Sequence, residues 1–208
     1  MKDTLMIDVY SSAILNESKC TLRETSYDED SSYYMTNSEI NVVFFDRAKE
    51  KYAEKLQLKE KQPMSVDALH TDNSGKMYLI EFRNRKMDRK SKREVNQKIF
   101  ESLLILTDEL CKNISCTRQN LSFILVYNET KNPSNEIENS TLQDNQSRNK
   151  IGKYISKKAK EDYIRFGLKR FKRLYFKDVY TVTEDEFEND FVRNWEKDEF
   201  SKSAIPFF

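Results

Sequence analysis

Two short segments, each carrying one acidic residue among apolar neighbours, constrain the fold of this chain more than any other feature. Residues 65–69 and 77–84 each have the length and apolar content of a β-strand. Between them, residues 70–76 have the composition of a hairpin turn, with Asp72, Asn73, Ser74 and Gly75 in succession. The sequence therefore predicts two neighbouring antiparallel strands on which the carboxylates of Asp67 and Glu81 converge.

Converging carboxylates repel each other, and such a pair is usually stable only with a bound cation or a shared proton. Arg83 follows Glu81 by two residues. Because side chains alternate along a strand, both should point to one face and Phe82 to the other. The alternation predicts a polar cluster of two acids and one base on one face of a sheet.

Composition limits the class of protein. Lys and Arg number 36 and Asp and Glu number 35, which gives a net charge of +1 and argues against nucleic-acid binding through bulk charge alone. Three cysteines and one histidine do not supply a paired zinc motif. The N-terminus lacks a signal-peptide pattern, and no apolar run approaches the ~20 residues of a membrane span. We expect a soluble, cytoplasmic protein without membrane association.

Periodicity along the rest of the chain predicts an α/β fold, a mixed β-sheet flanked by helices. Helices are expected over residues 38–56, from Asp88 to about residue 110, over 151–171 and over 185–195, and further strands over 121–127 and 174–182. Residues 1–37 form an N-terminal extension in this interpretation. Residues 38–208 form a single domain with an exposed, asparagine-rich loop at 128–149.

An acid on one strand, followed by Glu-x-basic on the next, resembles the PD-(D/E)xK nuclease superfamily. The resemblance implies a restriction-endonuclease-like core of a helix, three strands, a helix and a strand, with the third strand at residues 59–64 or 5–10. It also implies that Asp67 and Glu81 hold Mg²⁺ or Mn²⁺. Arg83 stands where the superfamily has lysine; its guanidinium stays protonated, so it can clamp a phosphate but cannot act as a base.

Basic residues follow the second acidic strand closely and predict a phosphate-binding surface beside the site: Arg85, Lys86, Arg89 and Lys90. Together with the resemblance, this surface suggests a metal-dependent nuclease that acts on DNA or RNA. Proteins of this kind often serve in phage defence or mobile-element conflict.

Three alternatives remain open at this stage. Asp67 and Glu81 are ordinary exposed strand residues if Glu81 simply pairs with a cross-strand cation. The fold can also serve a catalytically inactive binding protein, such as an immunity, anti-defence or partner-recognition module, which the near-zero net charge and Arg83 favour. A third reading is a structural subunit that docks its C-terminal Pro206-Phe207-Phe208 onto another protein.

Overall fold

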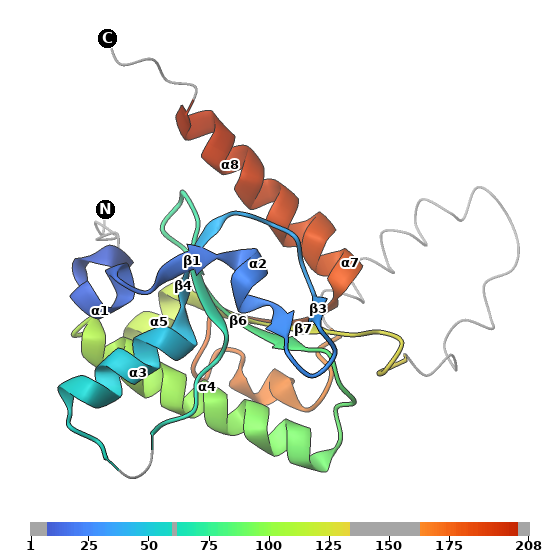
Figure 1. Cartoon of the computed structure of the whole chain (residues 1–208), viewed down its shortest axis with the longest axis horizontal. Helices are drawn as coiled ribbons and strands as arrows, with labels where there is room; N and C mark the ends of the chain where they lie inside the picture. Colours follow the sequence, from blue (N-terminus) through green and yellow to red (C-terminus); the bar gives the residue numbers. More distant parts are fainter. Residues whose placement is uncertain (1–7, 60–61, 134–162, 204–208) are drawn as a thin grey trace, which may run out of the picture.

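Six strands form one mixed sheet in the order β1-β4-β5-β6-β7-β8 (Figure 1). The computed structural model describes residues 8–59, 62–133 and 163–203. The strands are β1 (Lys19–Thr21), β4 (Asn41–Phe44), β5 (Ala68–Thr71), β6 (Met77–Arg83), β7 (Leu121–Tyr127) and β8 (Asp178–Thr183). Helices cover both faces, which confirms the predicted fold class. No helix in the described part of the chain is long and apolar enough to cross a membrane.

The sheet changes direction at β6. Strands β1, β4, β5 and β6 are antiparallel neighbours, whereas β7 runs parallel to β6 and β8 parallel to β7. A parallel pair needs a crossover connection, and the 21-residue α4 (Arg89–Glu109), followed by α5 (Ile114–Asn120), supplies it between β6 and β7. The predicted hairpin is confirmed, since β5 pairs with β6 in the register His70↔Tyr78. Its first strand is Ala68–Thr71 and not 65–69, which leaves Asp67 just before the strand.

Alternation along the strands separates two apolar layers. Leu79, with Phe123 and Leu125 of β7, packs on the side of α3 (Phe45–Lys55) and α4. Ile80 and Phe82 face the opposite layer, with Phe187 of α7 (Glu184–Phe187) and residues of the following π-helical turn (Glu188–Val192) and α8 (Arg193–Ser203). Glu81 therefore points from β6 into the α4 layer.

One expected helix is partly wrong. Residues 38–56 do not form a single helix, because Asn41–Phe44 is strand β4 and α3 begins only at Phe45. Val42 and Val43 are β-branched and fully buried, and β4 is paired with β1 on one side and β5 on the other. The third strand of the antiparallel part is thus at Asn41–Phe44, and the described residues 8–10, 59 and 62–64 are not strand; residues 5–7 and 60–61 lie outside the described residues.

The described part of the N-terminal segment, from residue 8 on, contributes a strand to the sheet and side chains to both apolar layers, where an appended extension was expected. β1 pairs with β4, and Leu15 of α1 (Ala13–Asn16) and Leu22 of α2 (Leu22–Thr25) are fully buried. After α2, strands β2 (Tyr27–Asp28) and β3 (Tyr33–Tyr34) form a small hairpin.

The C-terminal third differs from expectation in two further places. Residues 163–171 are not helical as predicted: Phe166 and Gly167 have φ of 60° and 78°, which interrupts an α-helix, and only the 3₁₀ turn Leu168–Phe171 follows. The last strand, predicted over 174–182, is Asp178–Thr183, and the final helical segment begins at Glu184 and extends to Ser203. Residues 134–149 of the predicted loop, 151–162 of the predicted helix and the 206–208 tail lie outside the described residues.

Candidate functional site

The candidate site lies where β5 separates from β6. Asp67 immediately precedes β5, and its backbone N–H still donates to the Ile80 carbonyl at 3.1 Å. The Phe82 N–H then donates to Asp67 Oδ2 at 2.6 Å. One residue earlier, the Val66 N–H donates to Ser102 Oγ of α4 at 2.9 Å. The chain therefore leaves the sheet at this point. The Asp67 carboxylate accepts the hydrogen bond from the Phe82 N–H in place of a backbone carbonyl of a neighbouring strand.

Lys98 of α4 joins the two predicted carboxylates. Its Nζ lies 3.1 Å from Asp67 Oδ1 and 2.9 and 3.0 Å from the two oxygens of Glu81. Asp67 and Glu81 therefore converge as the sequence predicted, with one ammonium between them. The alternative that both are ordinary exposed strand residues is wrong, because the Glu81 side chain is fully buried and that of Asp67 is 15% exposed.

Arg83 lies on the same face as Glu81, as its spacing predicted. Its Nε is 2.7 Å from Glu81 Oε1, a close ion pair without hydrogen-bond geometry, and its Nη1 is 3.6 Å from Glu94 Oε2. Nη2 is buried and has no hydrogen-bond partner among the described residues. Arg85, also held by Glu94 at 2.6 Å, keeps 54% of its side chain exposed.

These groups form an electrically balanced cluster in which Glu81 and Lys98 titrate abnormally. Burial, followed by the charge of Asp67, raises the pKa of Glu81 to about 7. Burial alone would lower the pKa of Lys98, but the negative charges of Asp67 and Glu81 outweigh it and raise that pKa above its ordinary value. Lys98 therefore stays protonated at neutral pH, while Glu81 is the group that changes charge there. Perturbed pKa values of this kind concentrate at functional sites.

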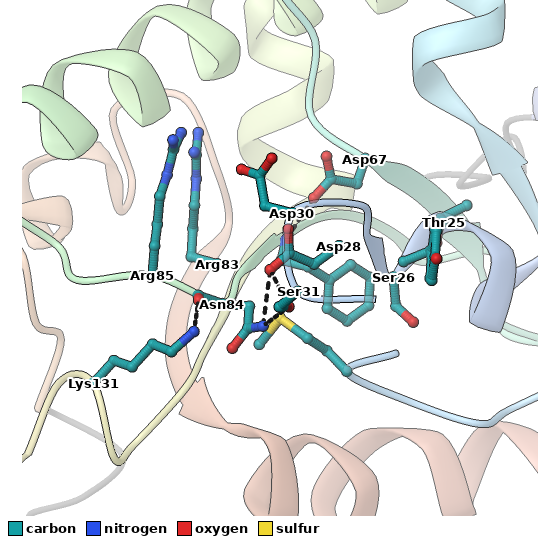
Figure 2. A pocket seen from close by; sticks show the side chains of 13 residues that line it. Thr25, Ser26, Asp28, Asp30, Ser31, Asp67, Arg83, Asn84, Arg85 and Lys131 are labelled. Atoms are coloured by element: carbon teal, nitrogen blue, oxygen red, sulfur yellow. Dashed lines mark hydrogen bonds between the residues drawn. The ribbon is translucent and has the colours of Figure 1, made fainter. Parts of the chain in front are cut away.

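A cavity of about 460 Å³ opens beside the cluster (Figure 2). One part of its lining comes from the ends of β5 and β6, with Asp67 just before β5, Arg83 at the end of β6 and Arg85 after it. Residues of the β2–β3 hairpin supply another part. Figure 2 shows Arg83 and Arg85 extended in the same direction, consistent with their shared contact to Glu94. Glu81 is buried behind this surface and does not line the cavity.

Asn84, directly after β6, holds the two walls together. Its Nδ2 donates to Asp28 Oδ2 at 2.8 Å and to Ser31 Oγ at 2.7 Å, both on the hairpin. The backbone carbonyl oxygen of Asn84 accepts a hydrogen bond from Lys131 Nζ at 2.6 Å, which places that ammonium at the cavity. The 8%-exposed Asn84 is therefore a positioning residue for both walls.

The predicted phosphate-binding residues are only partly brought to this cavity. Arg85 lines it, whereas Lys86 lines a second cavity of about 650 Å³ with Lys92, Lys131 and Arg165. Lys131 borders both cavities, so they adjoin. Arg89 and Lys90 are exposed in the first turn of α4 and line neither.

The donor set fits Mg²⁺ better than a softer metal. Among the described residues no group of three or more His, Cys, Asp or Glu side chains is arranged to hold a metal. Mg²⁺ is commonly held by one or two carboxylates, with waters and substrate phosphate oxygens completing its coordination. Asp67 and Glu81 meet that minimum if Lys98 moves aside. Comparisons of the chain with protein-family models, with curated proteins and with solved structures each found no match.

Proposed function

We propose that this protein is a metal-dependent nuclease that cleaves phosphodiester bonds of DNA or RNA at Asp67, Glu81 and Lys98. The observation that carries the proposal is the position of Lys98 Nζ, within 3.1 Å of both carboxylates. The resemblance asks for a lysine two residues after Glu81, where the chain has Arg83 instead. Helix α4 supplies an ammonium to the same carboxylates from another direction.

The order of elements gives further support. The resemblance implies a helix, three strands, a helix and a strand. After the first helix of that order, the chain matches it with antiparallel β4, β5 and β6, then α4, then β7 parallel to β6. Asp67 immediately precedes the second strand of this series and Glu81 lies on the third, at the point where these two strands separate. One difference is that α3 lies between β4 and β5.

In this proposal each side chain has a separate task. Asp67 and Glu81 hold the Mg²⁺ or Mn²⁺ ion, which supplies a polarised phosphate and a water of lowered pKa. Lys98, which stays protonated beside the two carboxylates, would stabilise negative charge that develops on the phosphate. Arg83 cannot accept a proton, and its unpaired Nη2 is positioned to donate to a phosphate oxygen.

The test is cleavage of labelled single-stranded and duplex DNA and RNA in Mg²⁺ or Mn²⁺, with EDTA as the metal-free control. We expect metal-dependent cleavage by the wild type and a loss of about 100-fold or more in Asp67→Asn and in Glu81→Gln, because each replaces a charged metal ligand by a neutral amide. Arg93→Ala is the matched control, since it removes an exposed charge from α4, the helix that carries Lys98. Wild-type protein that cleaves none of these substrates would overturn the proposal.

One observation favours the second candidate, a catalytically inactive binding protein. Lys98 and Arg83 together supply two positive charges to the two carboxylates, and Arg83 replaces the expected lysine. If this candidate is correct, no substrate is cleaved, and a nucleic acid or protein partner binds in a way that charge reversal at Arg85 weakens. Roles in phage defence or mobile-element conflict stay predictions under either candidate.

A further inference from the structure

An aromatic surface stands on the wall of the cavity opposite the arginines. Tyr27 of the β2–β3 hairpin lines the cavity and is 42% exposed. One face of its ring is covered by Tyr34, at a centroid distance of 4.6 Å, and Arg23 lies 4.0 Å from the centroid of the Tyr34 ring. Tyr27 is therefore held by a tilted contact with Tyr34, whose ring is itself contacted by Arg23, and it lines the cavity.

We propose that this cavity binds one nucleotide of a single-stranded nucleic acid, with its phosphate at Arg83 and Arg85 and its base stacked on Tyr27. The inference rests on the proposed function and adds to it the class of substrate. It concerns binding, so it can be tested without cleavage.

The arginine side of the cavity has the chemistry of an anion site. Arg83 is 5% exposed, yet its Nη2 has no hydrogen-bond partner among the described residues. A buried guanidinium N–H without an acceptor is unfavourable, and a phosphate oxygen is the acceptor that fits its charge. Arg85 and the ammonium of Lys131, which donates to a backbone carbonyl, add positive charge to the same cavity.

The acidic residues of the cavity are largely committed to other partners. Asp67 is paired with Lys98, and Asp28 accepts from Asn84 and from Ser31 on its own hairpin. Asp30 is the remaining acid of the lining and is exposed to solvent. Arg83 and Arg85 are themselves paired with Glu94, so a phosphate bound there shares both guanidinium groups with that carboxylate.

Size and stacking favour a single strand over a duplex. A cavity of about 460 Å³ lies within the range of small-ligand pockets, and it is walled by a hairpin tied to the end of β6. A base can stack on an aromatic side chain only when it is not already stacked and paired inside a helix. Stacking of this kind tolerates any base, so the site requires no particular sequence.

The experiment measures binding of a 5′-labelled 12-nucleotide single strand, DNA or RNA, and of the matching duplex, by fluorescence anisotropy in EDTA. We expect the single strand to bind about tenfold more tightly than the duplex. Tyr27→Ala should weaken single-strand binding about tenfold, and Tyr27→Phe should preserve it, because the phenyl ring still stacks. An abasic single strand should bind weakly and lose its dependence on Tyr27.

Tyr33→Ala is the matched control. Tyr33 lies on the same hairpin and is also 42% exposed, but it donates to Glu184 and does not line this cavity. Equal binding of duplex and single strand, or equal effects of Tyr27→Ala and Tyr33→Ala, would overturn the inference. Tyr27-dependent binding without cleavage would retain it and overturn the proposed function. Cleavage of the duplex that Tyr27→Ala leaves unchanged would support the proposed function and overturn the inference of single-strand binding.

Discussion

Glu81 is a carboxylate in a layer otherwise built from apolar side chains, and it is tolerable there only because cations reach it. Lys98 and Arg83 both lie within 3.0 Å of its oxygens. Burying an ion without a partner is strongly unfavourable, and removing one member of a buried pair typically costs about 3–5 kcal/mol. The three side chains should therefore be regarded as one unit, in which no single substitution leaves the others undisturbed.

The raised pKa of Glu81 predicts a characteristic pH dependence of stability. Its ordinary pKa is 4.5 and its folded-state pKa is about 7, so between these values the folded protein binds the proton more tightly. The contribution of Glu81 is greatest below about pH 4.5 and is lost as the pH rises through 7. The free energy of unfolding of the wild type should therefore fall relative to that of Glu81→Gln as the pH rises from 5 to 8. We expect this difference to change by at most about 3 kcal/mol over the interval, whatever its value at pH 5.

Urea denaturation at four pH values across this interval measures the difference. Parallel pH profiles for wild type and Glu81→Gln would contradict the expected proton uptake by this carboxylate.

The sequence predicted part of the site because the information was local. A period of two placed Glu81 and Arg83 on one face, and a turn-like link brought Asp67 beside them. Lys98 was missed although a signal existed: it lies three residues after Val95 and four before Ser102, on the buried stripe of α4. Asn84 and Tyr27 could not be predicted, because their neighbours are distant in sequence and carry no periodic signal.

At the scale of elements, strand β4 shows why a helical pattern can mislead. Ile40, Val43 and Phe44 match helical spacing, yet Val42 and Val43 are both buried, on opposite faces of the sheet. A strand paired on both edges and covered on both faces has no polar side to reveal its period. Only pairing with β1 and β5, both distant in sequence, fixes this segment as a strand.

The β2–β3 hairpin depends on Asn84 for its position, which makes Asn84→Ala a test of this element. The substitution removes two hydrogen bonds to the hairpin and one from Asn128. We expect a loss of about 2 kcal/mol in the free energy of unfolding and faster amide exchange within residues 27–34. Hydrogen–deuterium exchange with mass spectrometry measures both effects.

Asn73→Ala is its control, because Asn73 is exposed and makes one side-chain bond, to the Asp198 carbonyl. Unchanged exchange in the hairpin of Asn84→Ala would show that other contacts hold it.

For the whole molecule, the described part of the N-terminal segment belongs to the same cooperative unit as the rest of the sheet. Leu22 is fully buried with Ile80 and Phe187, which lie far from it in the sequence. Leu22→Ala should therefore lower the stability of a single unfolding transition by about 2–5 kcal/mol, through lost burial and the cavity it leaves.

Leu104→Ala, at a leucine that is 66% exposed on α4, is the comparison and should change stability by about 0.5 kcal/mol or less. Calorimetry distinguishes the outcomes. Two separate transitions, or a Leu22→Ala variant as stable as the wild type, would mean that the segment folds apart from the sheet.

The fold class was predictable from the chain as a whole because its central elements are long and strongly patterned. β6, α4 and β7 together specify a parallel crossover. The N-terminal elements were not predictable, since α1, β1 and α2 have only three or four residues each and are stabilised by partners far away in sequence.

Lys98 also has a consequence for how this protein behaves without ions. The ammonium acts as an internal counter-ion, so the two carboxylates can be assembled without an external cation. Under the proposed function, folding of this cluster therefore does not require a bound ion. Any divalent ion must instead compete with a tethered positive charge that never leaves the molecule. Under the proposed function, such competition favours weak, readily reversible binding of the ion at this site.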